Sequence, residues 1–139
     1  MTDSLDYDLY ANRLWLPAVL SKAEGPERAI FHHLLSASRI WLMRSNGISP
    51  TEAPSVELSE DGLLRIHDEW ARAVATFEYG HEVHYRSLRG DPGSCSFGDI
   101  ARHVMNHGTY HRGQLGALFG AAGLDLPETD FISFAFART

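Results

Sequence analysis

Three histidines recur at steps of four residues in the segment RHVMNHGTYHRGQL. His103, His107 and His111 would project from one side of a helix, because four residues advance the chain by about 400°. Apolar residues such as Val104 form a stripe beside His107 and His111, whereas His103 lies at its rim. The spacing favours His107 and His111 as an inward-facing pair that could bind a metal ion. Partly buried, hydrogen-bonded histidines are the alternative interpretation.

One helix supplies at most two well-placed ligands, so a catalytic site of the zinc type needs a third ligand from elsewhere and an open position. The segment AIFHHLLSASRIWLMR offers His33, which helical spacing places within a buried face, whereas His32 is rotated about 100° toward solvent. His67 shares an apolar stripe with Trp70 on another helical segment and is the competing choice. Either histidine could instead be a core residue that bonds a backbone carbonyl.

Helical periodicity covers most of the chain, and one segment interrupts it. HEVHYRSLRGDPGSCS alternates side-chain types around Gly90 and Pro92, which predicts a short extended or hairpin excursion before the fourth helix. The tail LPETDFISFAFART is expected to add a short helix that packs its Phe residues. The four main helices are expected at about Ser4 to Leu20, Pro26 to Asn46, Ser59 or Glu60 to just before Gly80, and from a Ser96 cap to Gly123.

These elements predict an all-α fold. The expected architecture is an up-and-down four-helix bundle formed by residues 1–139 as a single domain, with the metal between facing helices. The chain has a formal net charge of −6 and a pI near 5.7, which argues against nucleic acid as a partner. Its N-terminus lacks the pattern of a signal peptide, and no apolar run approaches the length of a membrane span. The single cysteine, Cys95, cannot form an internal disulfide, so we expect a cytoplasmic protein.

The segments NHGTYHRGQLGALFGAAG and HHLLSASRIWLMR resemble the DinB-like (DinB/YfiT) superfamily of metal-dependent four-helix-bundle proteins. The pattern of that family is similar to a His eight residues before a Trp, followed on a later helix by N-H-G-x-x-H-R-G-Q. His33 stands eight residues before Trp41, and His107 and His111 match the later pair. The resemblance therefore implies that His33, His107 and His111 are the metal ligands. Two further residues of the motif are interpreted as structural, with an ion pair for Arg112 and a helix–helix hydrogen bond for Gln114.

Three neutral imidazoles suit zinc or nickel, and ferrous iron accepts the same ligands. A metal ion with one open coordination position could bind and activate water or a thiolate there at neutral pH. The resemblance implies an enzyme similar to thiol S-transferases, which uses a low-molecular-weight thiol such as bacillithiol, mycothiol or glutathione on a small-molecule substrate. It also implies a homodimer built from helix contacts. The alternatives are a metal-assisted hydrolase and a non-enzymatic metal-binding or dimerisation module.

Overall fold

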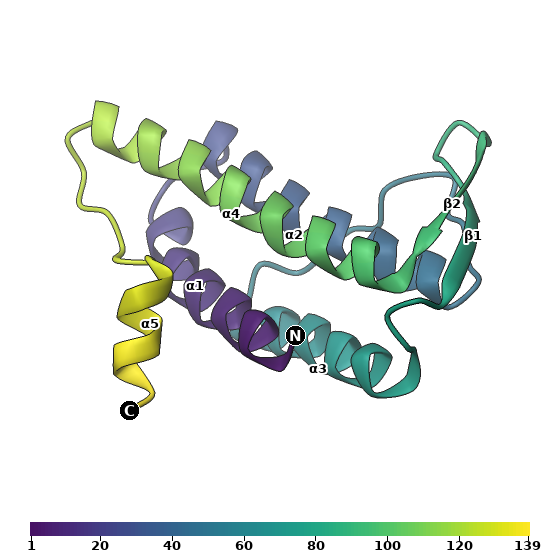
Figure 1. The fold of residues 1–139 in the computed structure, drawn as a ribbon. Helices are drawn as coiled ribbons and strands as arrows, with labels where there is room; N and C mark the ends of the chain where they lie inside the picture. Colours follow the sequence, from purple (N-terminus) through teal and green to yellow (C-terminus); the bar gives the residue numbers. More distant parts are fainter.

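The computed structural model describes residues 1–139, and most of them are helical (Figure 1). Two short antiparallel strands form a hairpin between the third and fourth helices, so the expected hairpin excursion is confirmed. The chain is thus mainly helical with one two-stranded sheet. The elements are α1 (Thr2–Leu20), α2 (Pro26–Ser45), α3 (Glu60–Thr76), β1 (Glu82–Arg86), β2 (Pro92–Ser96), α4 (Phe97–Ala121) and α5 (Phe131–Ala137).

Local capping explains where α3 and α4 begin and where α4 ends. Ser59 Oγ accepts a hydrogen bond from the Gly62 N–H at the start of α3, and Ser96 Oγ accepts one from the Asp99 N–H at the start of α4. Each bond satisfies a backbone donor that has no partner within the first turn. Beyond α4, Gly123 has a φ of +70°, the left-handed conformation that terminates many helices. The predicted caps and the predicted stop are therefore confirmed.

The helix directions differ from the strict alternation expected of an up-and-down bundle. The connection over residues 46–59 runs back along α2, where Ser36 Oγ donates to the Pro54 carbonyl and the Val56 N–H donates to His32 Nε2. Helix α3 consequently begins near the start of α2 and runs parallel to it (Figure 1). The connection is long enough to act as a crossover, which lets two consecutive helices point the same way. It also half-buries His32, which was expected to face solvent.

The core lies where the four long helices meet. Helix α2 packs chiefly against α4, and α1 chiefly against α3. Trp70, Phe31, Phe97 and Leu35 are fully buried, and Trp70 Nε1 donates a 2.7 Å hydrogen bond to Ser38 Oγ inside the core. None of the helices combines the length and the apolar character that crossing a bilayer would require.

The C-terminal helix α5 is only partly covered. Phe134 is buried, with its ring centroid 5.8 Å from that of Tyr7 and 5.3 Å from that of Tyr10. Ile132 and Phe136 remain 57% and 71% exposed. The predicted short helix is confirmed, but it does not bury all of its Phe residues, since a helix of about two turns presents only one side to α1.

Candidate metal centre

Helices α2 and α4 bring three histidines together. His33 extends from α2, and its ring centroid lies 5.1 Å from that of His107 and 4.7 Å from that of His111 on α4. One ligand nitrogen of each ring lies within 4.8 Å of the others, and the Nε2 atoms of His107 and His111 are 3.0 Å apart. Nitrogen ligands around tetrahedral zinc, at about 2.0–2.1 Å from the ion, are about 3.3 Å apart. Small side-chain rotations would let all three imidazoles reach one ion, so the donor set fits a divalent metal.

The other candidate histidines lie outside this cluster. His67 is on α3, where its Nε2 is 3.0 Å from Asp6 Oδ1. His103 is exposed on α4, with its ring centroid 5.4 Å from that of His107 and 5.7 Å from that of Trp41. The structure thus groups the three residues that the motif indicates, and metal binding by them stays a prediction.

The site lies at the surface of the helical core. His107 and His111 are half-buried, but His33 is exposed, although helical spacing predicted that it would lie within a buried face. The core-facing side of α2 is set instead by Phe31 and Leu35, which are 0% and 1% exposed. His33 is two residues from each of them, about 200° around the helix, and so lies on the opposite side. The cluster is therefore open to solvent on the side of His33.

Gln114 fixes the orientation of His111. Gln114 Oε1 lies 2.7 Å from His111 Nδ1, and an amide oxygen only accepts, so Nδ1 carries the proton and donates it. The lone pair of His111 Nε2 is then free to face the cluster. The helix–helix hydrogen bond predicted for Gln114 is therefore wrong. The signal that could have found this role is the three-residue spacing from His111, which places both side chains on one side of α4.

Burial keeps two of the imidazoles in the form that binds metal. It lowers the pKa of His107 to about 4, and the neighbouring His111 and His33 add to this shift. Partial desolvation beside the other two rings also lowers the pKa of His33, although this residue is exposed overall, and the nearby His111 contributes to the shift. Both rings are consequently neutral at pH 7, as metal ligation requires.

A second side of α4, about 100° around the helix from His107 and His111, fastens this helix to α1. Arg112 is 4% exposed, and its Nη1 donates to Asp8 Oδ1 at 2.7 Å and to Asn12 Oδ1 at 2.8 Å. The structural ion pair predicted for Arg112 is confirmed. Gly108 leaves room for this ion pair, because a Cβ atom there would lie 2.9 Å from Asp8 Oδ1 and 3.0 Å from Arg112 Nη1. The motif therefore presents histidines on one side of α4 and, about 100° around the helix, a clamp to α1 formed by Gly108 and Arg112.

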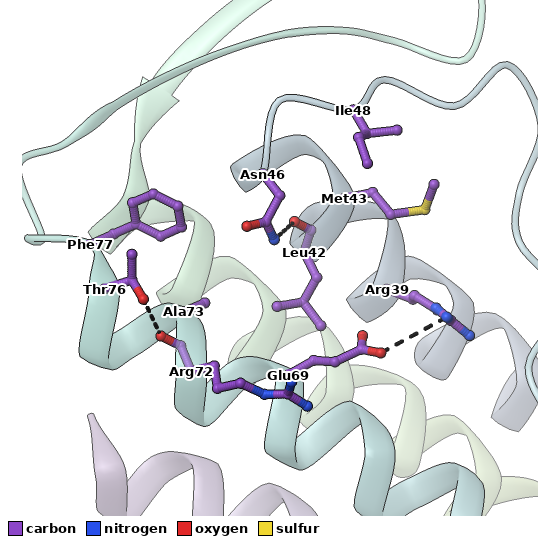
Figure 2. Close-up of a pocket in the computed structure, with 10 residues that line it drawn as sticks. All are labelled: Arg39, Leu42, Met43, Asn46, Ile48, Glu69, Arg72, Ala73, Thr76 and Phe77. Atoms are coloured by element: carbon purple, nitrogen blue, oxygen red, sulfur yellow. Dashed lines mark hydrogen bonds and ion pairs between the residues drawn. The ribbon is translucent and has the colours of Figure 1, made fainter.

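The largest cavity, of about 490 Å³, does not include these histidines. It lies between the C-terminal halves of α2 and α3. Figure 2 shows Leu42 and Phe77 among its lining residues, with an ion pair between Arg39 and Glu69 at one side. The candidate metal centre is thus an exposed surface site and is separate from this cavity.

The fold and the cluster define a mainly helical protein with a candidate three-histidine metal site. Residues 28–138 match the family model described as the DinB family, and the chain belongs to that family. It is also similar to Protein DinB of Bacillus subtilis (strain 168), with 30% identity over 90 residues. That match covers 62% of this chain and 51% of the relative, so the chain spans about half the length of the curated relative.

Replacing Gln114 with leucine is expected to weaken metal binding by about 10- to 100-fold, the usual effect of removing a hydrogen-bond partner of a ligand. Leucine has a similar volume but cannot accept the Nδ1 proton of His111. A competition titration of zinc against a chromophoric chelator would measure the affinity. Asn106→Ala changes an exposed polar residue of the same helix and should leave the affinity unchanged. Equal affinities for Gln114→Leu and the unmodified protein would contradict the orienting role.

Proposed function

We propose that this protein binds one divalent metal ion per chain through His33, His107 and His111, between facing helices of a four-helix bundle. The observation that carries the proposal is the convergence of three imidazole nitrogens from two helices within 4.8 Å. Zinc or nickel fits this ligand set, and ferrous iron is compatible with it. Three protein ligands leave one coordination position for a small molecule, and the exposure of His33 gives that molecule access.

The proposed activity is that of a thiol S-transferase, in which a low-molecular-weight thiol attacks an electrophilic small molecule. The thiol sulfur forms the new bond, the leaving group departs with its electron pair, and the thiol proton is released. A divalent metal supplies Lewis acidity that favours the thiolate at neutral pH. The chain's own cysteine does not fit the role of nucleophile, because burial raises the pKa of the Cys95 thiol. We propose a cytoplasmic location, where such thiols stay reduced.

This function is tested with untagged protein whose metal content has been measured. Glutathione, bacillithiol and mycothiol are each combined with a panel of electrophiles, and product formation is followed. Turnover should require both thiol and metal, disappear on chelation and return with zinc or nickel. His33→Ala and His111→Ala should be inactive although folded, whereas His103→Ala should retain activity. Thiol-dependent turnover that survives both substitutions would refute the mechanism, and ester hydrolysis without a thiol would favour the hydrolase.

We also propose a homodimer in which the exposed side of α5 takes part. Ile132 and Phe136 are 57% and 71% exposed, and neighbouring apolar side chains of this size are commonly covered by a partner. Sedimentation velocity at micromolar concentration should show a dimer, and the double variant Ile132→Ser with Phe136→Ser should be a monomer. Leu88→Ser, which removes an exposed apolar side chain from the hairpin turn, is the control and should remain dimeric. A monomer in the unmodified protein would count against the proposal.

A further inference from the structure

Arg44 is a buried cation without a counter-ion. The residue is 8% exposed, and its Nε atom is sealed from solvent with no acceptor in the chain. Its guanidinium forms no ion pair, in contrast to Arg112 with Asp8. A buried charge without a partner is strongly unfavourable, and buried donors in native proteins are almost always hydrogen-bonded. The structure therefore leaves Arg44 short of an acceptor.

Two aromatic rings hold the Arg44 guanidinium in place. Its central carbon lies 4.5 Å from the ring centroid of Trp41 and 4.9 Å from that of Tyr85. Gly93 on β2 makes room for Tyr85, because a Cβ atom at position 93 would lie 2.7 Å from the Tyr85 ring. The rings stabilise the positive charge through their faces. They offer no lone pair in the guanidinium plane, so the N–H groups of Arg44 still lack acceptors.

The protein groups nearest to Arg44 do not neutralise it. The Cys95 thiol interacts with the guanidinium, but burial raises the pKa of this thiol, so it is uncharged at pH 7. Nε is the one guanidinium nitrogen that is both sealed and without a partner. The terminal nitrogens are not sealed and form no hydrogen bond within the chain, so a dissolved anion can approach them beside the Trp41 and Tyr85 rings, which contact each other edge to face with centroids 5.0 Å apart.

We propose that Arg44, Trp41 and Tyr85 form a binding site for the carboxylate group of a small molecule. A carboxylate can lie in the plane of the guanidinium and accept two parallel N–H bonds, which is the geometry that arginine favours. Arg44 follows His33 by eleven residues, so it lies within about 20° of the same side of α2 and about 16 Å along the helix axis.

A row of rings links this carboxylate site to the histidine cluster. The ring of Trp41 is next to that of His103, and His103 is next to His107. A molecule that reacts at the histidines could therefore place an acid group at Arg44. This connection rests on the proposed function, whereas the carboxylate site itself does not.

The carboxylate site is tested by titrating the ¹⁵N-labelled protein with sodium acetate at constant ionic strength. The sealed Arg44 Nε–H should exchange slowly and give its own NMR signal, and the Trp41 indole N–H reports on the ring that covers it. Both signals should shift and reach saturation with acetate but not with sodium chloride. Absence of saturation would overturn the proposal. Tighter binding of inorganic phosphate than of acetate would overturn the assignment to carboxylates.

Three variants locate the binding at Arg44. Arg44→Gln should abolish the acetate response, and Arg44→Lys, which keeps the charge without the fork, should weaken binding about tenfold. Arg39→Gln removes the same charge from an exposed position of α2 and should bind acetate normally. Thermal melts check that each variant is folded. If Arg44→Gln is unfolded, acetate binding by Arg44→Lys is compared with that of Arg39→Gln instead. Acetate binding that survives both changes at Arg44, or that is lost equally in Arg39→Gln, would overturn the assignment.

A kinetic comparison tests the connection to the histidine cluster. In the metal-loaded protein, Arg44→Gln should raise KM for a carboxylate-bearing thiol, leave kcat unchanged and have no effect on KM for its methyl ester. Equal KM changes for acid and ester would overturn the connection. Acetate binding without thiol-dependent turnover would support the carboxylate site and count against the proposed function. Thiol-dependent turnover without acetate binding would support the proposed function and count against the carboxylate site.

Discussion

His107→Ala is expected to lose the bound metal ion, whereas His103→Ala is expected to keep one ion per chain. His107 is one corner of a triangle with the other two candidate ligands, with its Nε2 3.0 Å from that of His111 and its ring 5.1 Å from that of His33. Without His107 only two imidazoles remain, whereas catalytic zinc sites use three protein ligands. Elemental analysis after desalting would give the ratio of metal to chain.

His103→Ala is a matched control because it removes an exposed imidazole from the same side of the same helix, one turn away. His67→Ala removes a histidine that is engaged with Asp6 on another part of the surface. The ligand assignment would be wrong if His107→Ala kept its full metal content while either control lost it.

Arg112→Ala is expected to lower the free energy of unfolding by about 3–5 kcal/mol, the range observed when one partner of a buried ion pair is removed. The Asp8 carboxylate, whose side chain is 18% exposed, would be left without its cation. Asn12 Oδ1 would lose the hydrogen bond that it accepts from Arg112. Urea unfolding followed by circular dichroism would measure the change.

Arg102→Ala provides the comparison for this measurement. Arg102 is on the same helix and pairs with Asp99 at 3.3 Å, but both side chains are mostly exposed. Such surface pairs contribute about 0–1 kcal/mol, so this variant should unfold near the same urea concentration as the unmodified protein. Replacing Asp8 and Arg112 together by leucine and methionine should recover part of the loss, because no buried charge remains unpaired. Equal losses of unfolding free energy in Arg112→Ala and Arg102→Ala would contradict the stabilising role of the Arg112 ion pair.

Local signals in the sequence were sufficient for the starts of α3 and α4 and for the end of α4, whereas α3 ends at Thr76 and not just before Gly80, because Phe77 is already extended. Ser59, Ser96 and Gly123 bound two helices because capping and left-handed conformations depend on neighbouring residues alone. The four-residue spacing of His107 and His111 likewise fixes their mutual position within one helix. The choice of His33 over His67 needed the family motif, because helical periodicity cannot show which two helices will face each other.

Contacts between distant segments account for what the sequence did not predict. The parallel direction of α3 depends on bonds from the 46–59 connection to His32 and Ser36, and no local pattern specifies that this connection turns back. The exposure of His33 has a similar cause, since the buried side of α2 is decided by the helices that cover Phe31 and Leu35. The packing of the Arg44 guanidinium against Tyr85 likewise depends on the hairpin, which is distant from α2 in the sequence.

More than half of the chain separates His33 on α2 from His107 on α4, although their rings are 5.1 Å apart. An ion bound by both helices, as proposed, would act as a reversible cross-link that only the folded chain can form, so we expect the melting temperature to rise as free metal increases. Loss of that ion would remove the cross-link but leave the Arg112 bonds between α1 and α4 in place. On the proposed metal site, the contact between α2 and α4 would therefore open more readily when metal is scarce.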